Sequence, residues 1–378
     1  MNILFDLRAT QPNKSGKRHG GGRYGEVVFF RMVEMGIRFS CFYDSRKWFN
    51  PEVMTVIENS NIPLYDTAER SLQDIVHDEK IDRVYSCQPI LEIMSLKDCD
   101  IYGTIHGLRV LETPWDNCFW NYKNSFGEKT RFVVKKLVPK IWRAWEKWKF
   151  RKKYVYKSAK LVVVSEHTKY AIKAFFPELS NTKLEVFYSP NTSSGESKRV
   201  KSEEKYFLAV SGNRWAKNNV RAIKAFDELI SRGLIKGVRM KVAGASNNDI
   251  KYKVKNRDAF DFLGYVEDKE LEDLYAGAYL FVYPSLNEGF GYPPLEAMRY
   301  GVPVIASPFS SMAEVCDQGA LYFNPLLVEE IMGRMMMMMN EETYKEYSQR
   351  GLKQYQKIYE RQKRDLDGLI NYITNPIS

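Results

Sequence analysis

Two glutamates, Glu288 and Glu296, stand eight positions apart in a segment rich in glycine and apolar residues. Paired carboxylates could act as acid and base, or accept hydrogen bonds from a ligand's hydroxyl groups. Gly289 and Gly291, on the loop with Glu288, let backbone amides approach a ligand closely. The pattern predicts a buried strand, that loop, and a helix opening at Pro293–Pro294 with Glu296 in its first turn. Because a helix N-terminus attracts anions, we expect a polyhydroxylated, phosphate-bearing ligand here.

The predicted strands and helices that must position these carboxylates alternate along the chain. Strand-like segments such as Ile3–Asp6, Arg83–Ser86 and Leu280–Tyr283 are separated by helix-like segments. This alternation predicts parallel sheets covered by helices, and 378 residues suffice for two domains. In such sheets ligands bind beyond the carboxyl ends of the strands. Taken singly, however, Glu296 could merely complement the helix dipole and Glu288 could be a solvated loop residue.

A polar, charged stretch at 191–205 divides the two series of strands and helices. We therefore predict an N-terminal domain over 1–190, a linker over 191–205 and a C-terminal domain over 206–355. A polar helical segment over 356–378 follows the second domain.

The segment around the glutamates resembles the signature of the retaining glycosyltransferases of family 4, which have the GT-B fold. That signature reads E-G-F-G-x-x-x-x-E, followed by A-M-x-x-G-x-P-V-I-A-S. This chain has EGFG from position 288 and EAM from position 296, followed by Gly301, Pro303 and Ser307. The resemblance is strongest from Tyr206 to about Pro325 and looser over the first domain.

The resemblance implies an α/β architecture of two Rossmann-like βαβ domains facing a cleft. The N-terminal domain would meet the acceptor, the C-terminal domain would bind a nucleotide-diphosphate sugar, and the terminal helix would cross back to the first domain. It further implies a retaining, metal-independent, hexosyltransferase-like enzyme acting on a glycan or polyprenyl-linked glycan, in cell-surface polysaccharide or glycoconjugate synthesis. A nucleotide-sugar epimerase of the same fold and a non-catalytic nucleotide-sugar-binding protein remain as alternatives.

The resemblance also implies roles for individual residues near the motif. Glu296 would bind the ribose hydroxyls of the nucleotide, and Glu288 the hydroxyls of the donor sugar. Backbone amides at Phe290 and Gly291 would add contacts to the sugar, and amides near Leu295 contacts to the phosphates. Acid–base catalysis is therefore not required of either glutamate.

Two cations follow the first predicted strand of the second domain. Arg214 and Lys217 match the family's R-x-x-K-N element, whose cations bind the donor diphosphate. Fixed cations can stabilise the negative charge that develops on a departing diphosphate. Asn218, the next residue, is suited to begin the following helix.

The first domain supplies a histidine and a glycine-rich loop. His106 ends a predicted strand in the sequence TIHGLR, which resembles the family motif whose histidine contacts the donor sugar. The family usually has an acidic or amide residue next, where this chain has Gly107. The loop HGGGRYGE begins at residue 19, and its resemblance to the family's N-terminal glycine loop implies that Gly21 and Gly22 bind the donor.

The composition and short motifs limit the classes of function that remain open. The net charge is +10, yet no nucleic-acid-binding signature accompanies it. Five unpatterned cysteines favour reduced thiols in the cytoplasm, and no run of apolar residues predicts a membrane span. The triplet Asp98–Asp100 spells the metal-binding D-x-D, but it precedes a buried strand outside the usual context. We therefore expect no metal and no other cofactor.

Residues 129–156 combine many Lys and Arg side chains with apolar residues three or four apart. Such an amphipathic helix, bent at Pro139, could pack on the first sheet with its lysines in solvent. It could equally contact an anionic membrane surface, which would make the protein peripheral at the inner face of the membrane. The run Met335–Met339 predicts helical core packing with an exposed remainder.

Overall fold

The computed structural model describes residues 1–12, 20–122, 124–155, 159–180, 182, 184–192, 198–200, 202–246 and 248–375. The chain divides into two compact units. Unit 1 comprises Met1–Leu108, Ala144–Thr192 and Glu360–Ser378, and unit 2 comprises Arg109–Arg143 and Ser193–Tyr359. Among the described residues, none of the helices has the length and apolar character needed to cross a membrane.

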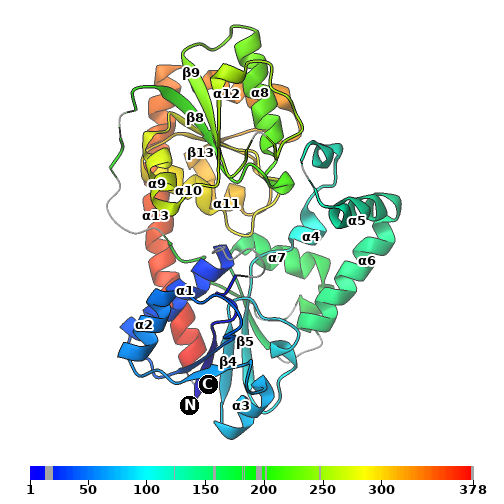
Figure 1. The fold of residues 1–378 in the computed structure, drawn as a ribbon, viewed down its shortest axis with the longest axis vertical. Coiled ribbons are helices and arrows are strands. Elements are labelled where there is room, and N and C mark those ends of the chain that lie inside the picture. The colour runs from blue at the N-terminus through cyan, green and yellow to red at the C-terminus, as the bar shows by residue number, and fades with distance from the viewer. Residues whose placement is uncertain are drawn as a thin grey trace. The chain divides into compact units, whose positions relative to one another are not determined.

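Unit 1 is built on a seven-stranded parallel sheet with the order β3-β2-β1-β4-β5-β6-β7 (Figure 1). Its strands are β1 (Ile3–Asp6), β2 (Ser40–Tyr43), β3 (Leu64–Asp66), β4 (Arg83–Ser86), β5 (Asp100–Ile105), β6 (Ala159–Val163) and β7 (Glu185–Val186). All four residues of β1 and of β4 are buried, as expected for parallel strands covered on both faces.

Helices connect these strands. They are α1 (Gly20–Glu34), α2 (Pro51–Asn59), α3 (Leu72–Asp78) and α7 (Glu166–Phe175), whereas α13 (Glu341–Thr374) follows the last strand and connects none. The end of α13 belongs to unit 1, where Arg31 of α1 binds Asp367 at 2.8 Å. The amide of Tyr188, after β7, donates to Asp365 at 3.0 Å.

Unit 2 is built on a six-stranded parallel sheet with the order β10-β9-β8-β11-β12-β13. Its strands are β8 (Lys205–Ala209), β9 (Val238–Ala243), β10 (Phe260–Gly264), β11 (Leu280–Tyr283), β12 (Val304–Ala306) and β13 (Ala320–Tyr322). Both sheets thus follow the strand order of the doubly wound α/β fold.

The helices of unit 2 come from both of its chain segments. They are α4 (Arg109–Glu112), α5 (Phe126–Leu137), α8 (Asn219–Ser231), α9 (Asp268–Gly277), α10 (Tyr292–Arg299), α11 (Met312–Cys316) and α12 (Val328–Met337), together with the first part of α13 and the start of α6 (Pro139–Phe150). Right-handed crossovers that run in opposite directions along a sheet lie on opposite faces. Helix α8 therefore covers one face, where it packs with α12, and α9 and α10 cover the other (Figure 1).

The methionine run behaves as its composition predicts. Met335 and Met338 are fully buried in the core beneath α12, whereas Met336 and Met337 are exposed. The prediction of helical core packing with an exposed remainder is confirmed.

The division into units differs from the predicted domain boundaries. Residues 109–143, predicted to belong to the N-terminal domain, belong to unit 2, and the return to unit 1 begins at Glu360 rather than at 356. Residues 193–197 and 201 of the predicted linker and residues 376–378 of the terminal segment lie outside the described residues. Elsewhere in the linker, the guanidinium of Arg199 donates to the carbonyls of Gly301 and Ala278, both in unit 2.

The basic segment forms two helices rather than one bent helix. A capping box at Ser125 and Glu128 begins α5, which ends at Leu137. Pro139 disfavours helical backbone at the residue before it, and Val138 accordingly leaves the helix with φ −129° and ψ 57°. Pro139 then occupies the first position of α6, where a missing N–H costs nothing. Tyr156, the last residue of the predicted segment, lies outside the described residues.

Candidate functional site

The carboxyl-terminal edge of the sheet in unit 2 carries the predicted donor residues of the second domain. The chain proceeds from β8 to β9 on one side and later returns to β11 on the other, so the strand order reverses between β8 and β11. Ligands of open α/β sheets bind at such a reversal. Arg214 and Lys217 follow β8, and Glu288 follows β11. The structure therefore brings Lys217 and Glu288 together from two neighbouring loops.

The carboxylate of Glu288 receives three hydrogen bonds on one oxygen. Its Oε1 accepts from Lys217 Nζ at 2.5 Å, from the Tyr283 hydroxyl at 2.8 Å and from the Ser285 hydroxyl at 2.5 Å. Lys217 Nζ also donates to the Tyr283 hydroxyl at 2.7 Å, and all four side chains are buried. Because these donors fix Oε1, the other oxygen, Oε2, is the one that a ligand hydroxyl could reach.

Lys217 and Glu288 form a buried ion pair. Burial opposes ionisation of Glu288, but the ammonium of Lys217 and the hydrogen bonds from Lys217 and Ser285 outweigh it, so the pKa of Glu288 lies below its usual value. Burial lowers the pKa of Lys217; Glu288 opposes this shift, whereas the positive charges of Arg214 and Arg109 reinforce it. Glu288 is therefore a carboxylate at neutral pH, suited to accept hydrogen bonds and unsuited to donate a proton.

The two loops of the site are bonded to each other. The amide of Leu286 donates to the carbonyl of Ala216 at 2.8 Å. The side-chain amide of Asn218 donates to the carbonyls of Pro284 and Pro325 at 3.1 and 2.7 Å. Asn218 does stand at the start of α8, but its side chain makes no capping bond, and its backbone is left-handed with φ 58°. Its predicted place at the start of the helix is confirmed, and its side chain joins the two loops.

Helix α10 carries the second glutamate of the motif. It begins at Tyr292, so Glu296 lies in the second turn rather than in the predicted first turn. Gly291 precedes the helix with φ 110°, a backbone conformation that a side chain would strain. The side chains of Phe290 and Leu295 are buried, and the predicted contacts of their backbone amides with a ligand stay a prediction.

Tyr283 and Ser285 are site residues that the motif-based prediction missed. Both side chains are fully buried, and both donate to Glu288. Burial, and then the charge of Glu288, raise the pKa of Tyr283 well above its usual value, so its hydroxyl stays protonated as a donor. Their position at the end of a predicted strand, within five residues of Glu288, was the available signal.

His106 belongs to unit 1, at the carboxyl end of β5. Its Nε2 lies 2.8 Å from the carbonyl oxygen of Cys87, and since a carbonyl only accepts, Nε2 carries the proton. The ring packs edge-on against Tyr24, with the centroids 4.8 Å apart. These contacts fix the orientation of the imidazole. Gly107 has φ 132°, so the glycine that departs from the family pattern occupies a backbone conformation unfavourable to side chains.

The predicted glycine loop is partly helical. Helix α1 begins at Gly20, so Gly21 and Gly22 lie in its first turn instead of in a loop, and residues 13–19, including the predicted loop's histidine, lie outside the described residues. A Cβ added to Gly21 would lie 1.4 Å from the Nε2 of Gln88, after β4. A side chain at position 21 would require the flexible Gln88 side chain to move, and the predicted donor contact of both glycines stays a prediction.

Asp6 is a buried polar residue at the strand reversal of unit 1, between β1 and β4. Its Oδ2 accepts from the Ser86 hydroxyl at 2.6 Å, and Arg8 Nε lies 3.9 Å from its Oδ1. Burial outweighs these contacts and raises the pKa of Asp6 to about 6. The sequence placed Asp6 in a strand without assigning it to a site.

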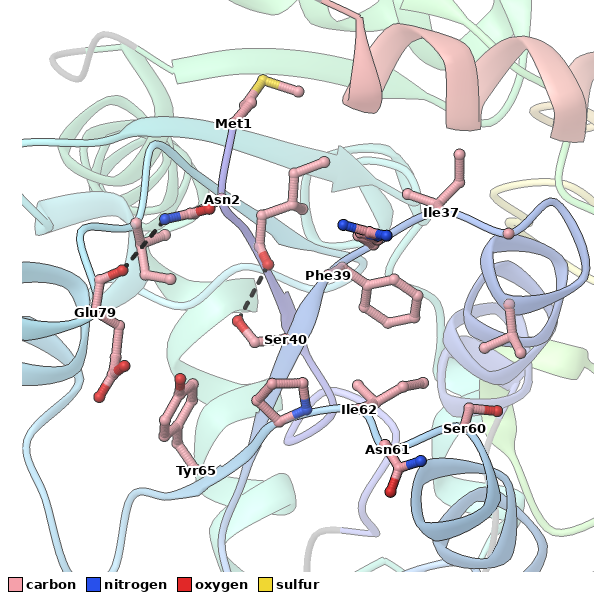
Figure 2. Close-up of a pocket in the computed structure, with 16 residues that line it drawn as sticks. Met1, Asn2, Ile37, Phe39, Ser40, Ser60, Asn61, Ile62, Tyr65 and Glu79 are labelled. Atoms are coloured by element: carbon pink, nitrogen blue, oxygen red, sulfur yellow. Dashed lines mark hydrogen bonds between the residues drawn. The ribbon is translucent and has the colours of Figure 1, made fainter.

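A cavity of about 880 Å³ in unit 1 lies at the opposite edge of the sheet. Figure 2 shows it beside Asn2, Phe39, Ser40 and Tyr65, which stand at or near the amino-terminal ends of β1, β2 and β3. Ligands of this fold bind at the carboxyl ends, and the cavity contains none of the predicted site residues. We therefore assign it no part in the site.

The D-x-D triplet lies at this amino-terminal edge as well. Asp100 begins β5 and pairs with Lys160 at 3.2 Å. Across the part of the chain that the structure describes, no group of three or more His, Cys, Asp or Glu side chains is arranged to hold a metal ion.

Known proteins similar to this chain include glycosyltransferases. Residues 192–357 match the family described as glycosyl transferases group 1. Over 151 residues the chain is 35% identical to the O-antigen chain mannosyltransferase RfbU of Salmonella typhimurium, a match covering 39% of this chain and 42% of that protein. Over 94 residues it is 44% identical to the O-antigen chain mannosyltransferase B of Escherichia coli, covering 25% of each. The chain thus spans less than half the length of these two relatives.

Solved structures resemble the chain over nearly its whole length. WaaG, a glycosyltransferase involved in lipopolysaccharide biosynthesis, superposes with a TM-score of 0.66 at 14% identity, covering 99% of this chain and 100% of that one. HepE of Anabaena, solved in complex with UDP and glucose, gives a TM-score of 0.62 at 14% identity, covering 98% and 99%. The chain therefore has the GT-B fold, with two Rossmann-like domains.

Proposed function

We propose that this protein is a retaining glycosyltransferase of family 4 type, with its E-x7-E motif at Glu288 and Glu296. It moves a sugar from a nucleotide-diphosphate sugar to a glycan or lipid-linked glycan in cell-surface polysaccharide synthesis. The observation that carries the proposal is the buried Lys217–Glu288 pair at the strand reversal between β8 and β11. The match of residues 192–357 to the glycosyl transferases group 1 family includes this pair and supports the same reading.

In the proposed mechanism the cations act on the leaving group. Lys217 and the exposed Arg214 bind the diphosphate and stabilise its charge as the bond to the sugar breaks. Lys217, which is buried and already hydrogen-bonded, needs no rearrangement to do so, and the proposed mechanism requires no metal. The acceptor attacks from the face that the diphosphate leaves, through an oxocarbenium-like transition state, so the anomeric configuration is retained without a protein nucleophile.

The carboxylates orient the donor. Glu288 accepts hydrogen bonds from the donor sugar through Oε2, because Oε1 is held by Lys217, Tyr283 and Ser285. Glu296 accepts from the ribose hydroxyls. Backbone amides at Phe290 and Gly291 contact the sugar, and amides near Leu295 contact the phosphates.

From unit 1, His106 contacts the donor sugar, and the first turn of α1, with Gly21 and Gly22, binds the donor diphosphate. The bond between His106 Nε2 and the Cys87 carbonyl supports this role, since it fixes the imidazole at the carboxyl end of β5.

A panel of nucleotide sugars tests the function. We expect nucleoside diphosphate release to depend on one donor and on an added glycan acceptor, with EDTA leaving the rate unchanged. Because the two relatives are named mannosyltransferases, GDP-mannose is the first donor to test. Product formed without an acceptor would favour an epimerase, and strict dependence on a divalent cation would contradict the metal-free mechanism.

We also propose that the protein is cytoplasmic and contacts an anionic membrane surface through residues 129–156. Ile141, Trp145 and Trp148 of α6 are exposed and recur at helical spacing, and Lys149 Nζ lies 3.5 Å from the Trp145 ring centroid. Apolar rings beside lysines suit the interface of an anionic bilayer. Flotation should show salt-sensitive binding to anionic vesicles, and equal recovery with neutral vesicles would contradict the contact.

A further inference from the structure

A cavity of about 310 Å³ lies within residues 109–143 of unit 2. One wall comes from α4 and the turn after it, including Leu111 and Pro114, and the other from the junction of α5 with α6. Three cations line this second wall, Lys135, Lys140 and Arg143, whereas Glu112 is the one acidic residue of the lining. The cavity thus combines an apolar lining with an excess of positive charge.

Lys135, the first of these cations, is buried, which is unusual for a lysine side chain. Helix α5 buries Lys135, which is 6% exposed, and leaves Phe126 and Leu137 of the same helix 81% and 75% exposed. The Lys135 ammonium lies 3.6 Å from the Trp115 ring centroid and 4.6 Å from that of Trp142. Aromatic faces stabilise a desolvated ammonium without neutralising it. Lys135 is therefore one of three cationic side chains that an anionic group in the cavity could approach.

An apolar strip of exposed residues, Leu137, Val138 and Ile141, stands next to the lining residues in sequence. Leu137 and Val138 directly precede Pro139, and Ile141, which is 69% exposed, follows Lys140. Exposed large apolar side chains gathered in one place mark interaction sites. A ligand with a negative head and an apolar chain would match both the cations of the cavity and this strip.

Residues that line the cavity contact both loops of the candidate donor site. Asn287 Nδ2 donates to Glu112 at 3.0 Å, and Asn287 directly precedes Glu288. Trp115 packs against Trp215, with ring centroids 4.9 Å apart, and Trp215 stands between Arg214 and Lys217 in the chain. A ligand in the cavity would therefore lie against the segment that supports the donor loops, within the same unit.

We propose that this cavity binds a phosphate ester carried on an apolar chain, with the phosphate at Lys135, Lys140 and Arg143 and the chain along Leu137, Val138 and Ile141. The assignment of this ligand as the acceptor's lipid-phosphate end rests on the proposed function. The binding site itself rests on the cavity and its charges.

Calorimetric titration of the full chain tests the site, with farnesyl phosphate as the probe and with inorganic phosphate and farnesol as its two halves. We expect farnesyl phosphate to bind at least tenfold more tightly than either half. The double variant K140A/R143A should weaken the binding of farnesyl phosphate at least tenfold, because it removes two cations from the lining. Both side chains are exposed, so their loss should not affect folding. The single variant K135M, which removes the ammonium but keeps the side-chain length, should weaken this binding similarly.

The matched control is K129A/R131A, which removes the same charge from α5 without changing the cavity lining. Its affinity for farnesyl phosphate should stay within twofold of the wild type. Equal weakening in control and test variants would overturn the proposal, since net charge would then explain the binding. Binding to phosphatidylglycerol vesicles without binding of soluble farnesyl phosphate would also overturn it, because the basic face and not the cavity would then be responsible.

Nucleotide-sugar binding, measured on the same proteins, separates this proposal from the proposed function. We expect K140A/R143A to bind the donor as the wild type does while losing farnesyl phosphate. A wild-type chain that bound farnesyl phosphate and no nucleotide sugar would contradict the proposed function and leave the cavity site standing.

Discussion

Each unit buries a carboxyl group where its strand order reverses, but the two groups differ in ionisation. In unit 2, Glu288 lies 2.5 Å from Lys217 Nζ, and its pKa is lowered. In unit 1, Asp6 accepts a hydrogen bond from Ser86, while Arg8 Nε is 3.9 Å away, and its pKa is raised to about 6. Both carboxyls are almost completely buried, so burial alone does not decide their charge.

The position of the nearest cation makes the difference. Lys217 donates directly to Glu288, whereas Arg8 also pairs with Glu92 at 3.2 Å and lies over the ring of Phe42. A charge in direct contact outweighs the desolvation penalty, and a more distant, shared charge does not. The reversal in unit 2 therefore holds fixed charges of both signs, to which the proposed function assigns the binding of a nucleotide-diphosphate sugar.

Removal of Lys217 should produce the largest effect. In K217M the buried Glu288 loses its counter-charge, so we expect the free energy of unfolding to fall by about 3–5 kcal/mol. Turnover should fall by about 10²–10³-fold, because a preorganised stabiliser of the leaving group is lost. Urea denaturation and steady-state kinetics measure both changes.

Two further variants separate the effect of the charges on turnover from their effect on stability. K217M/E288Q removes both charges and should regain most of the lost stability but none of the activity. R214A, at an exposed position, should lower turnover at least tenfold while changing stability by no more than about 0.5 kcal/mol. Near-normal turnover in both K217M and R214A would exclude the cations from leaving-group stabilisation.

A smaller effect is expected at Asp6, and it depends on pH. The folded pKa of about 6 exceeds the ordinary value of 3.8, so this group stabilises the fold below pH 4, and that contribution is lost as pH rises through 6. D6N does not titrate, so its stability relative to wild type should rise by about 3 kcal/mol between pH 4 and pH 8. Denaturant titrations of both proteins across this range measure the difference. A constant difference would mean that Asp6 is ionised throughout, as Glu288 is.

Much of the site in unit 2 was predictable because its chemistry is encoded locally. The E-x7-E segment and the R-x-x-K-N element each lie just after a strand, and parallel strands bring such loops to one edge. The alternation of apolar and polar segments likewise predicted the parallel sheets. Tyr283 and Ser285 were not predicted, because a hydroxyl at a strand end has many partners available until the loops are placed.

The segment 109–143 shows where sequence reasoning fails. Its membership in unit 2 depends on contacts distant in sequence, such as Tyr122 with Val220 and Asp116 with Arg221. For residues 129–156 the amphipathic pattern left open either packing on the sheet with solvated lysines or contact with a membrane surface. Helix α5 buries Lys135 and exposes Leu137. Periodicity defines the faces of a helix but does not determine which face the fold covers.

A crystal structure of the chain with the donor identified by the nucleotide-sugar panel tests the central claim most directly. We predict the diphosphate in contact with Arg214 and Lys217, a sugar hydroxyl on Glu288 Oε2 and the ribose on Glu296. A nucleotide sugar bound away from the carboxyl ends of β8 and β11 would contradict the account.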